Sequence, residues 1–328
     1  MSDTAETGIA QHGAAAASTA REHAGSVSIS PDRRRWLQLA LAALWLFAGI
    51  LQYQTYMFST DFSTSLLAEA AEGNPGWIAS SVLWAAHVVE GSPVLVNAAF
   101  ATLQVGIGLA IAFRPTLRIG LLVSVVWSLL VWCFGEGLGL LLTGAATALT
   151  GAPGAVLLYA VLSLLLWPVG EGASASFVAS RPIGVPAAKS VWVVLWGGLA
   201  ALNLQPSQLT GDSVSSKVSG MADGQPTWVR VLVDGFAGVS AGHGTLFSLL
   251  GAAIMALVAV GILLPSRWTR PVLVGALVVS AFIWVVGESI GMPFGGMSTD
   301  VNSGPLLALM ALAYWPGTHT LSAKGVTA

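Results

Sequence analysis

The sequence has few charged residues and almost no cysteine. Charged side chains make up 9% of its 328 residues, against roughly a quarter in an ordinary soluble domain. Its single cysteine, Cys133, excludes an intramolecular disulfide, thiol relay chemistry and metal sites built on several cysteines. A formal net charge of −2 gives no reason to expect nucleic-acid binding. The sequence also contains no nucleotide-binding loop in the required context and no Ser-His-Asp or zinc-protease spacing.

Apolar residues dominate instead. They make up 55% of the chain, and the mean hydropathy is +0.78. Several apolar runs approach or exceed the roughly 20 residues that cross a bilayer as a helix. We therefore predict an all-α, polytopic membrane protein with about eight transmembrane helices. They are expected near residues 37–58, 93–113, 117–135, 153–168, 189–206, 244–264, 270–287 and 303–316.

The motif Trp-x-x-Gly-Glu-x-x-Gly occurs twice. Its two glutamates, Glu136 and Glu288, are 152 residues apart (288 − 136). Pro153 and Pro305 repeat the same offset downstream. The nearly constant offset predicts a tandem duplication with four helices in each copy. Upstream, residues recur at an offset of 151: Trp45, Gln54, Asp61, Gly73, Pro75 and Trp77 return as Trp196, Gln205, Asp212, Gly224, Pro226 and Trp228.

The basic residues predict how the chain crosses the membrane. Of the thirteen, only Lys217 and Arg230 fall outside the tails, the 2–3 and 6–7 loops and the linker between the copies. The positive-inside rule then places both termini in the cytoplasm of a multi-pass protein of the cell membrane. Because each copy has an even number of helices, both copies enter the membrane in the same orientation. A pseudo-twofold axis along the membrane normal should relate them.

These features divide the chain into five expected parts. They are a disordered cytoplasmic tail (1–35), a first four-helix repeat (36–168), a cytoplasmic linker (169–188), a second four-helix repeat (189–320) and a short cytoplasmic tail (321–328).

The outer segments 59–92 and 207–243 share the pattern Gly-[Asn/Gln]-Pro-x-Trp. Each pattern predicts a turn fixed by proline, Pro75 or Pro226, and then an amphipathic helix at the outer interface. Trp77 and Trp228 would lie at headgroup depth. The glycine-broken segment 137–152 predicts a re-entrant loop, which is tolerated only against protein or a water-filled cavity.

The two glutamates are the first candidates for function, because a carboxylate in strongly apolar sequence is costly. Each is expected at the outer end of the third helix of its repeat. One interpretation is that Glu136 and Glu288 line an outward-facing vestibule that binds a cation or passes protons. The other is that each caps its glycine-rich loop by accepting backbone N–H bonds. The sequence leaves both interpretations open.

Amides and tryptophans lie at the same predicted level. Gln54 and Gln205 end the first and fifth helices, where they either cap open carbonyls or form the polar rim of a ligand site. Trp132 and Trp284 precede the glutamates by one turn and either pack in the protein or stack on a flat ligand such as a quinone ring. Hydrogen bonds between helices explain Gln104 adequately.

Two histidines are the candidates for metal binding. His87 and His243 are predicted to be extracytoplasmic, and histidine with methionine is a copper-type ligand set. The spacing is not tight, however, and the methionines do not recur at the repeat offset. We therefore expect no metal site.

A four-helix membrane unit with a long first outer loop and an acidic end to its third helix, here Gly135-Glu136 and Gly287-Glu288, resembles the DoxX-like superfamily. That superfamily includes the DoxX, DoxD and MauE-like proteins. The resemblance implies an accessory subunit of a membrane redox system that contacts quinone or assists an extracytoplasmic oxidoreductase. The usual unit is single, whereas this one is fused in tandem. Its lack of paired cysteines puts a thiol-based role in doubt.

Three functions therefore remain open. The chain is an accessory subunit that works in the bilayer with a membrane or extracytoplasmic redox protein, a transporter or channel for small solutes or ions, or an assembly protein whose outer segments 59–92 and 207–243 dock a partner. We expect no catalytic activity of its own, because the sequence has no convincing nucleophile or metal cluster.

Overall fold

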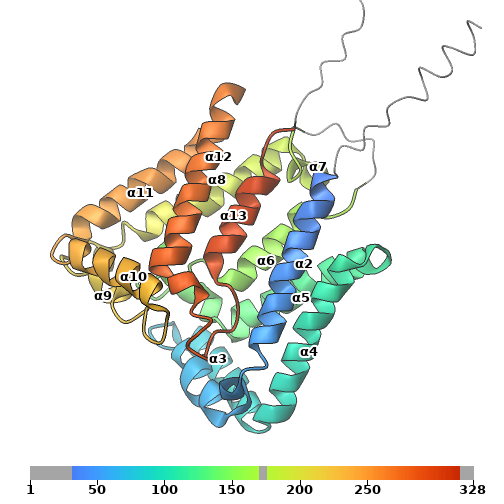
Figure 1. Ribbon diagram of the computed structural model, residues 1–328, viewed down its shortest axis with the longest axis vertical. Helices are drawn as coiled ribbons and strands as arrows, with labels where there is room; N and C mark the ends of the chain where they lie inside the picture. The colour runs from blue at the N-terminus through green and yellow to red at the C-terminus, as the bar shows by residue number, and fades with distance from the viewer. Residues whose placement is uncertain (1–31, 170–175, 318–328) are drawn as a thin grey trace, which may run out of the picture. The chain divides into compact units, whose positions relative to one another are not determined.

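The computed structural model describes residues 32–169 and 176–317 (Figure 1). The chain divides into two compact units, Met1–Trp36 and Leu37–Ala328. Only residues 32–36 of the first unit are described, and they include the start of the first helix. Most of the expected tail 1–35, part of the linker 169–188 and the whole tail 321–328 lie outside the described residues.

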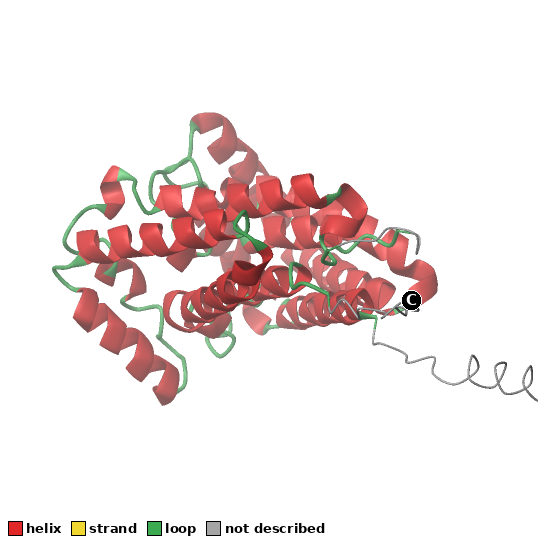
Figure 2. Ribbon diagram, turned by 90° about the horizontal axis from the view of Figure 1, so that it is seen from above, coloured by secondary structure: helices red, strands yellow, loops and turns green. Residues whose placement is uncertain are grey.

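The described residues form helices and loops with no strand, as Figure 2 shows. The predicted all-α class is therefore confirmed. Six helical stretches are long and apolar enough to cross a membrane. They are α2 (Arg33–Leu51), α4 (Pro93–Ala112), Arg114–Phe134 with α5 (Leu117–Phe134), α8 (Val185–Leu202), α11 (Gly244–Gly261) and Ser266–Gly287 with α12 (Ser266–Phe282).

Two further apolar helices are shorter. α6 (Ala155–Leu165) and α13 (Ser303–Ala313) have 11 residues each, so each is about 16 Å long against a hydrocarbon core of roughly 30 Å. The expected bounds 153–168 and 303–316 were therefore too long. The expected helix 37–58 also ends early, because Gln54 has an extended backbone (φ −65°, ψ 144°) that separates α2 from a short turn at Thr55–Phe58.

The remaining helices lie in the outer segments and the linker. α3 (Gly76–Glu90) and α10 (Thr227–Ser240) each begin directly after a proline, Pro75 or Pro226. The carbonyl of each proline accepts the first backbone N–H bonds of its helix. Trp77 and Trp228 are 68% and 56% exposed. The short helices are α7 (Ser180–Ile183) and α9 (Ser215–Val218).

Small residues allow α2 and α4 to cross closely. A Cβ atom at Gly49 would lie 2.8 Å from the backbone nitrogen of Val105, and one at Gly108 would lie 2.7 Å from the Leu46 side chain. Membrane helices commonly use such contacts, because van der Waals packing holds them together where lipid provides no hydrophobic drive. The crossing places α2 and α4 around the cavity described below.

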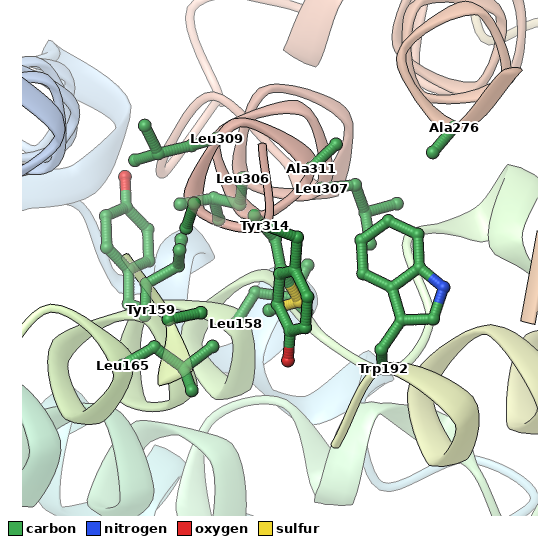
Figure 3. Packing of buried hydrophobic residues seen from close by; sticks show 14 of the residues in the cluster. Leu158, Tyr159, Leu165, Trp192, Ala276, Leu306, Leu307, Leu309, Ala311 and Tyr314 are labelled. Carbon is green, nitrogen blue, oxygen red and sulfur yellow. The ribbon is translucent and has the colours of Figure 1, made fainter. Parts of the chain in front are cut away.

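The two short helices meet in the middle of the hydrophobic core. α6 and α13 contact each other, and their side chains belong to one buried cluster with residues from both halves of the chain. Figure 3 shows Leu158 and Tyr159 on the side of α13 that carries Leu306, and Trp192 of α8 beside Leu307. The core therefore joins the two halves through the helices that follow the two glutamates.

Candidate functional site

Each glutamate is followed by four residues with left-handed backbone. The φ angles of Gly137–Leu140 are 52°, 58°, 64° and 58°, and those of residues 289–292 are 48°, 56°, 80° and 51°. This conformation costs roughly 1–2 kcal/mol for each L-residue that adopts it. Glycine is required at the third position, because a Cβ at Gly139 would collide with the Pro153 carbonyl and one at Gly291 would lie 2.9 Å from the Val301 carbonyl. The turns thus bring the next segment close to each glutamate.

The motif tryptophans fix these loops. Trp132 Nε1 donates to the Pro153 carbonyl at 2.9 Å, and Trp284 Nε1 donates to the Val301 carbonyl at 3.1 Å. Pro153 therefore corresponds in its contacts to Val301, at an offset of 148 residues (301 − 153). The interpretation of Pro153 and Pro305 as equivalent is wrong, because the second loop is four residues shorter (152 − 148).

Glu288 caps the start of α13. Its carboxylate accepts the backbone N–H groups of Ser303 and Gly304 at 3.0 and 2.9 Å, and it also accepts the Ser303 hydroxyl. The side chain is completely buried. Burial raises the pKa of the Glu288 carboxyl to about 7, against the lowering effect of these hydrogen bonds. The positive end of a helix and its open N–H groups suit a carboxylate in this place.

Glu136 occupies the corresponding place before α6, but its surroundings differ. The side chain is partly buried, and Oε2 is enclosed without a hydrogen-bond partner among the described residues. A Cβ at Gly154 would collide with this oxygen, so glycine is needed there. Burial raises the pKa of the Glu136 carboxyl to about 8; the nearby Asp300 raises it further, whereas the Val156 backbone amide lowers it.

A cavity of about 530 Å³ lies beside Glu136. This volume falls in the range of roughly 300–1,000 Å³ that is typical of small-molecule sites. Helices α2 to α6 of the first half form most of the wall, and a loop of the second half completes it. The wall is mainly apolar and has seven aromatic side chains: Trp45, Phe62, Trp84, Phe100, Trp127, Phe134 and Tyr159.

Five residues of this wall each carry a buried polar atom without a hydrogen-bond partner in the described part of the chain. A buried unsatisfied group costs roughly 1–3 kcal/mol, and native proteins contain few of them. Their concentration around one apolar cavity is the pattern of a ligand site with a few polar contacts. The atoms are Gln52 Oε1, Gln104 Oε1, Trp127 Nε1, Glu136 Oε2 and Tyr159 Oη.

The cavity reaches the surface between α3 and α5. Trp84 and Val88 of α3 and Leu130 of α5 line it and are 62%, 48% and 47% exposed. Trp84 contacts Phe134 edge to face, with ring centroids 5.9 Å apart. The rim is therefore apolar, and one side of it belongs to a helix that is long and apolar enough to span a membrane.

Of the six residues that the sequence suggested for a vestibule, only Glu136 lines this cavity. Trp132, Trp284 and Glu288 hold the loops, as described above. Gln54 and Gln205 each reach the glycine-rich loop of the opposite half. Gln54 Nε2 donates to the Ser298 carbonyl at 3.5 Å, and Gln205 Oε1 lies 3.8 Å from the place of a Cβ at Gly144.

Most of the polar wall was missed by sequence reasoning. Gln104 was assigned to helix–helix hydrogen bonding, but its Oε1 atom has no such partner among the described residues. A comparison of the two halves of the sequence indicates these residues, because several polar and aromatic side chains of the wall are not repeated in the second half. At the repeat offsets, the second half has Met255 for Gln104, Val279 for Trp127 and Leu307 for Tyr159.

One of the corresponding polar side chains in the second half is paired by direct contacts. Asn203, which corresponds to Gln52, donates through Nδ2 to the Leu199 carbonyl at 2.9 Å and to Met255 Sδ at 3.5 Å. Both Asn203 and Met255 are buried. The polar and aromatic wall is therefore a property of the first half.

The histidines lie in local contacts. His87 Nδ1 is 3.5 Å from Glu90 Oε2, and His243 Nδ1 is 3.1 Å from the Ala241 carbonyl. Within residues 32–169 and 176–317, no group of three or more His, Cys, Asp or Glu side chains could hold a metal ion.

Comparisons of the chain with protein-family models, with curated proteins and with solved structures found no match.

Proposed function

We propose that the chain is an eight-helix protein of the cell membrane, built from two four-helix units in the same orientation with both termini in the cytoplasm. The six long apolar helices and the shorter α6 and α13 support this count. The recurring tryptophan bonds and left-handed turns support the repeat. So does the reciprocal placement of Gln54 and Gln205, each beside the loop of the other half.

Its proposed function is to bind a flat, lipid-soluble molecule of the quinone class in the first-half cavity, as an accessory subunit of a membrane redox system. One observation carries the proposal: five buried polar atoms without a partner among the described residues belong to the wall of a single aromatic cavity. The resemblance to the DoxX-like superfamily supports the same ligand class and the same accessory role.

The chemistry of the wall suits such a ligand. Aromatic side chains favour offset or edge contacts with a flat ring. The Trp127 indole N–H and the Tyr159 hydroxyl are donors for the ring oxygens of a quinone, and the amides of Gln52 and Gln104 can act as donors or acceptors. The apolar rim at Trp84 suits access from the hydrocarbon region of a bilayer.

Quenching of tryptophan fluorescence by decylubiquinone in detergent tests the proposal. The best variants copy the second half into the first, Gln104→Met and Tyr159→Leu, because the corresponding positions already hold Met255 and Leu307 in a packed fold. We expect each variant to weaken binding at least about tenfold, since a missing good hydrogen bond to a buried group is worth over 1 kcal/mol.

Met255→Leu is the matched control, because Met255 does not line the cavity. It should bind decylubiquinone as the parent does. Saturable binding that is equally strong in the parent and in both wall variants would place the ligand elsewhere and would refute the proposed site. Absence of binding to the parent would refute the ligand class.

A second candidate rests on the charges of the wall. Glu136 and Asp300 line the cavity, and none of its lining residues is basic. Acidic groups beside aromatic faces suit an organic cation, which would favour the ionised form of Glu136 on binding. This fits a transporter of amphipathic cations. Tetraphenylphosphonium flux into liposomes tests this alternative. Flux that Glu136→Gln abolishes, without binding of decylubiquinone, would replace the quinone proposal.

A further inference from the structure

We propose that the second half of the chain supplies one wall of the first-half cavity, on which Asp300 selects the hydroxyl-bearing quinol form of the ligand and Glu288 positions Asp300. The inference rests on the proposed function, because it concerns the same cavity. It also predicts one ligand site in each chain. The wall is the loop between the second left-handed turn and α13, and its lining residues are Gly291, Met292, Met297, Ser298, Thr299, Asp300 and Asn302.

The Glu288 segment fixes the end of this loop that leads into α13. Glu288 holds the start of α13 through Ser303 and Gly304, and the Trp284 indole holds the Val301 carbonyl. Ser298 Oγ bridges the loop from inside, with bonds to the carbonyls of Gly291 at 2.5 Å and Asp300 at 2.8 Å. Asp300 thus lies between anchored points.

The loop also touches the first half directly. Gln54 Nε2, just after the end of α2, donates to the Ser298 carbonyl at 3.5 Å. Gln54 Oε1 lies 4.0 Å from the place of a Cβ at Gly296. These contacts place the wall against the helix that contributes Trp45 and Gln52 to the cavity. A loop of the second half therefore contributes to a cavity of the first half.

Asp300 offers an acceptor to the cavity. Its Oδ1 accepts the Asn302 backbone N–H at 2.6 Å, and no hydrogen bond to Oδ2 is found within the described chain. With Glu136 it forms an acidic side of the cavity that lacks any basic residue. Carboxylate acceptors favour ligands with O–H donors. A quinol has two such donors on its ring, whereas a quinone has none.

The corresponding loop of the first half offers no carboxylate to the second half. Through the contact offset of 148, Asp300 corresponds to Ala152, which has no polar side chain. Ala152 is buried in the core cluster. A corresponding site in the second half would thus lack the loop carboxylate as well as the polar helix residues, so the duplicated chain has one complete set of ligand groups.

Affinities for decylubiquinol and decylubiquinone, measured in a double-mutant cycle, test the inference. Asp300→Asn should weaken quinol binding at least tenfold and change quinone binding less than threefold. Glu288→Gln and Ser298→Ala should each weaken quinol binding in the parent but have no further effect in the Asp300→Asn background, because both act through Asp300. Asp223→Asn, on an exposed outer loop, is the matched control and should bind as the parent does.

If Glu288→Gln fails to fold, the quinol affinity of Ser298→Ala still tests the inference. Unchanged quinol affinity in Asp300→Asn, or equal losses for Ser298→Ala in both backgrounds, would overturn the inference. The second result is what a general structural role predicts.

A ligand-free measurement separates this inference from the proposed function. The infrared carboxyl bands are recorded over a range of pH, and the spectra of the Asp300→Asn variant are subtracted from those of the parent. The difference follows the titration of Asp300 alone. Burial raises the pKa of Asp300 to about 6, against the lowering effect of the Asn302 backbone N–H. Ser298→Ala should move the midpoint towards the ordinary value of an aspartate. An unmoved midpoint refutes the positioning, even if the parent binds neither decylubiquinol nor decylubiquinone.

Discussion

The segments around Glu136 and Glu288 share a motif, a left-handed turn and a tryptophan hydrogen bond, yet their carboxylates have different surroundings. Glu288 is completely buried and accepts three hydrogen bonds from the start of α13. Glu136 has an oxygen without a partner among the described residues and lines a cavity. Two copies of one motif can therefore hold a carboxylate that caps a helix in one place and a carboxyl that lines a cavity in the other.

The difference comes from residues outside the motif. Ser303 supplies Glu288 with both a backbone and a hydroxyl donor, whereas Ala155 begins α6 without a side-chain donor. Around Glu136, Gln104 and Tyr159 replace the Met255 and Leu307 of the second half. The comparison teaches that the helices surrounding a repeated turn, more than the turn itself, decide what its glutamate does.

The largest expected effect is the loss of stability when the Glu288 carboxylate is removed from the start of α13. Glu288→Ala leaves the Gly304 N–H and the Ser303 hydroxyl buried and unpaired, whereas the Ser303 N–H keeps Asn302 Oδ1 as its acceptor. This should lower the free energy of unfolding by about 3 kcal/mol. Glu136→Gln should change it by less than about 1 kcal/mol, because the amide replaces a carboxyl that burial keeps largely neutral. Thermal unfolding in detergent measures both, with the exposed Glu72→Gln as the control. Equal losses in Glu288→Ala and Glu136→Gln would refute the division of roles.

The next effect is a dependence of stability on pH. Burial raises the pKa values of Asp300, Glu288 and Glu136 to about 6, 7 and 8. A carboxyl with a raised pKa in the folded state adds stability that is present below its unfolded pKa and is lost as pH rises through the folded value. Stability should therefore fall as the pH rises from 5 to 9.

The Glu136→Gln variant tests which part of the pH dependence of stability comes from Glu136. The variant should remove the loss between about pH 7 and 8, where only Glu136 still holds its proton in the folded state, and make the loss below pH 7 shallower. Melting curves of the parent and the variant at half-unit pH intervals measure the difference. Parallel curves across the whole range would contradict the assignment.

The smallest effect tests the left-handed turns. Ser289 has a φ of 48° and a buried hydroxyl without a partner in the described chain, whereas its counterpart is Gly137. Ser289→Gly should therefore stabilise the protein by about 1 kcal/mol. Gly137→Ser should destabilise it, since a Cβ there would collide with the Ala70 carbonyl. Chemical unfolding in mixed micelles measures both. Stabilisation by Gly137→Ser would contradict the turn geometry.

The sequence alone supported the all-α class, the apolar helices and the repeated motif, because hydropathy and spacing are local properties. It left the role of each glutamate open, and this choice depends on donors 15 and 16 residues later, at Ser303 and Gly304. The match of Pro153 with Pro305 was wrong because the second loop is shorter than the first. The tryptophan hydrogen bonds, to Pro153 in one copy and to Val301 in the other, show which residues correspond.

The polar wall of the cavity was hidden for another physical reason. A polar residue such as Gln104 in a membrane helix usually bonds a neighbouring helix, as Asn97 does through the Gln52 carbonyl at 2.8 Å. Only the packing shows that Gln104 lies at a cavity instead. Asp300 belongs to no sequence motif. Its position at the cavity depends on the fold of a loop of the second half that contacts the first half.

Photolabelling with an azido-ubiquinone, followed by peptide mapping, tests the central claim most directly. The proposed site predicts one label per chain, in peptides that contain the α4–α5 wall around Gln104 and Trp127 or the loop around Asp300, and loss of the label with excess decylubiquinol. Label shared equally between the Glu136 wall and the corresponding residues of the second half, around Met255 and Val279, would contradict the account.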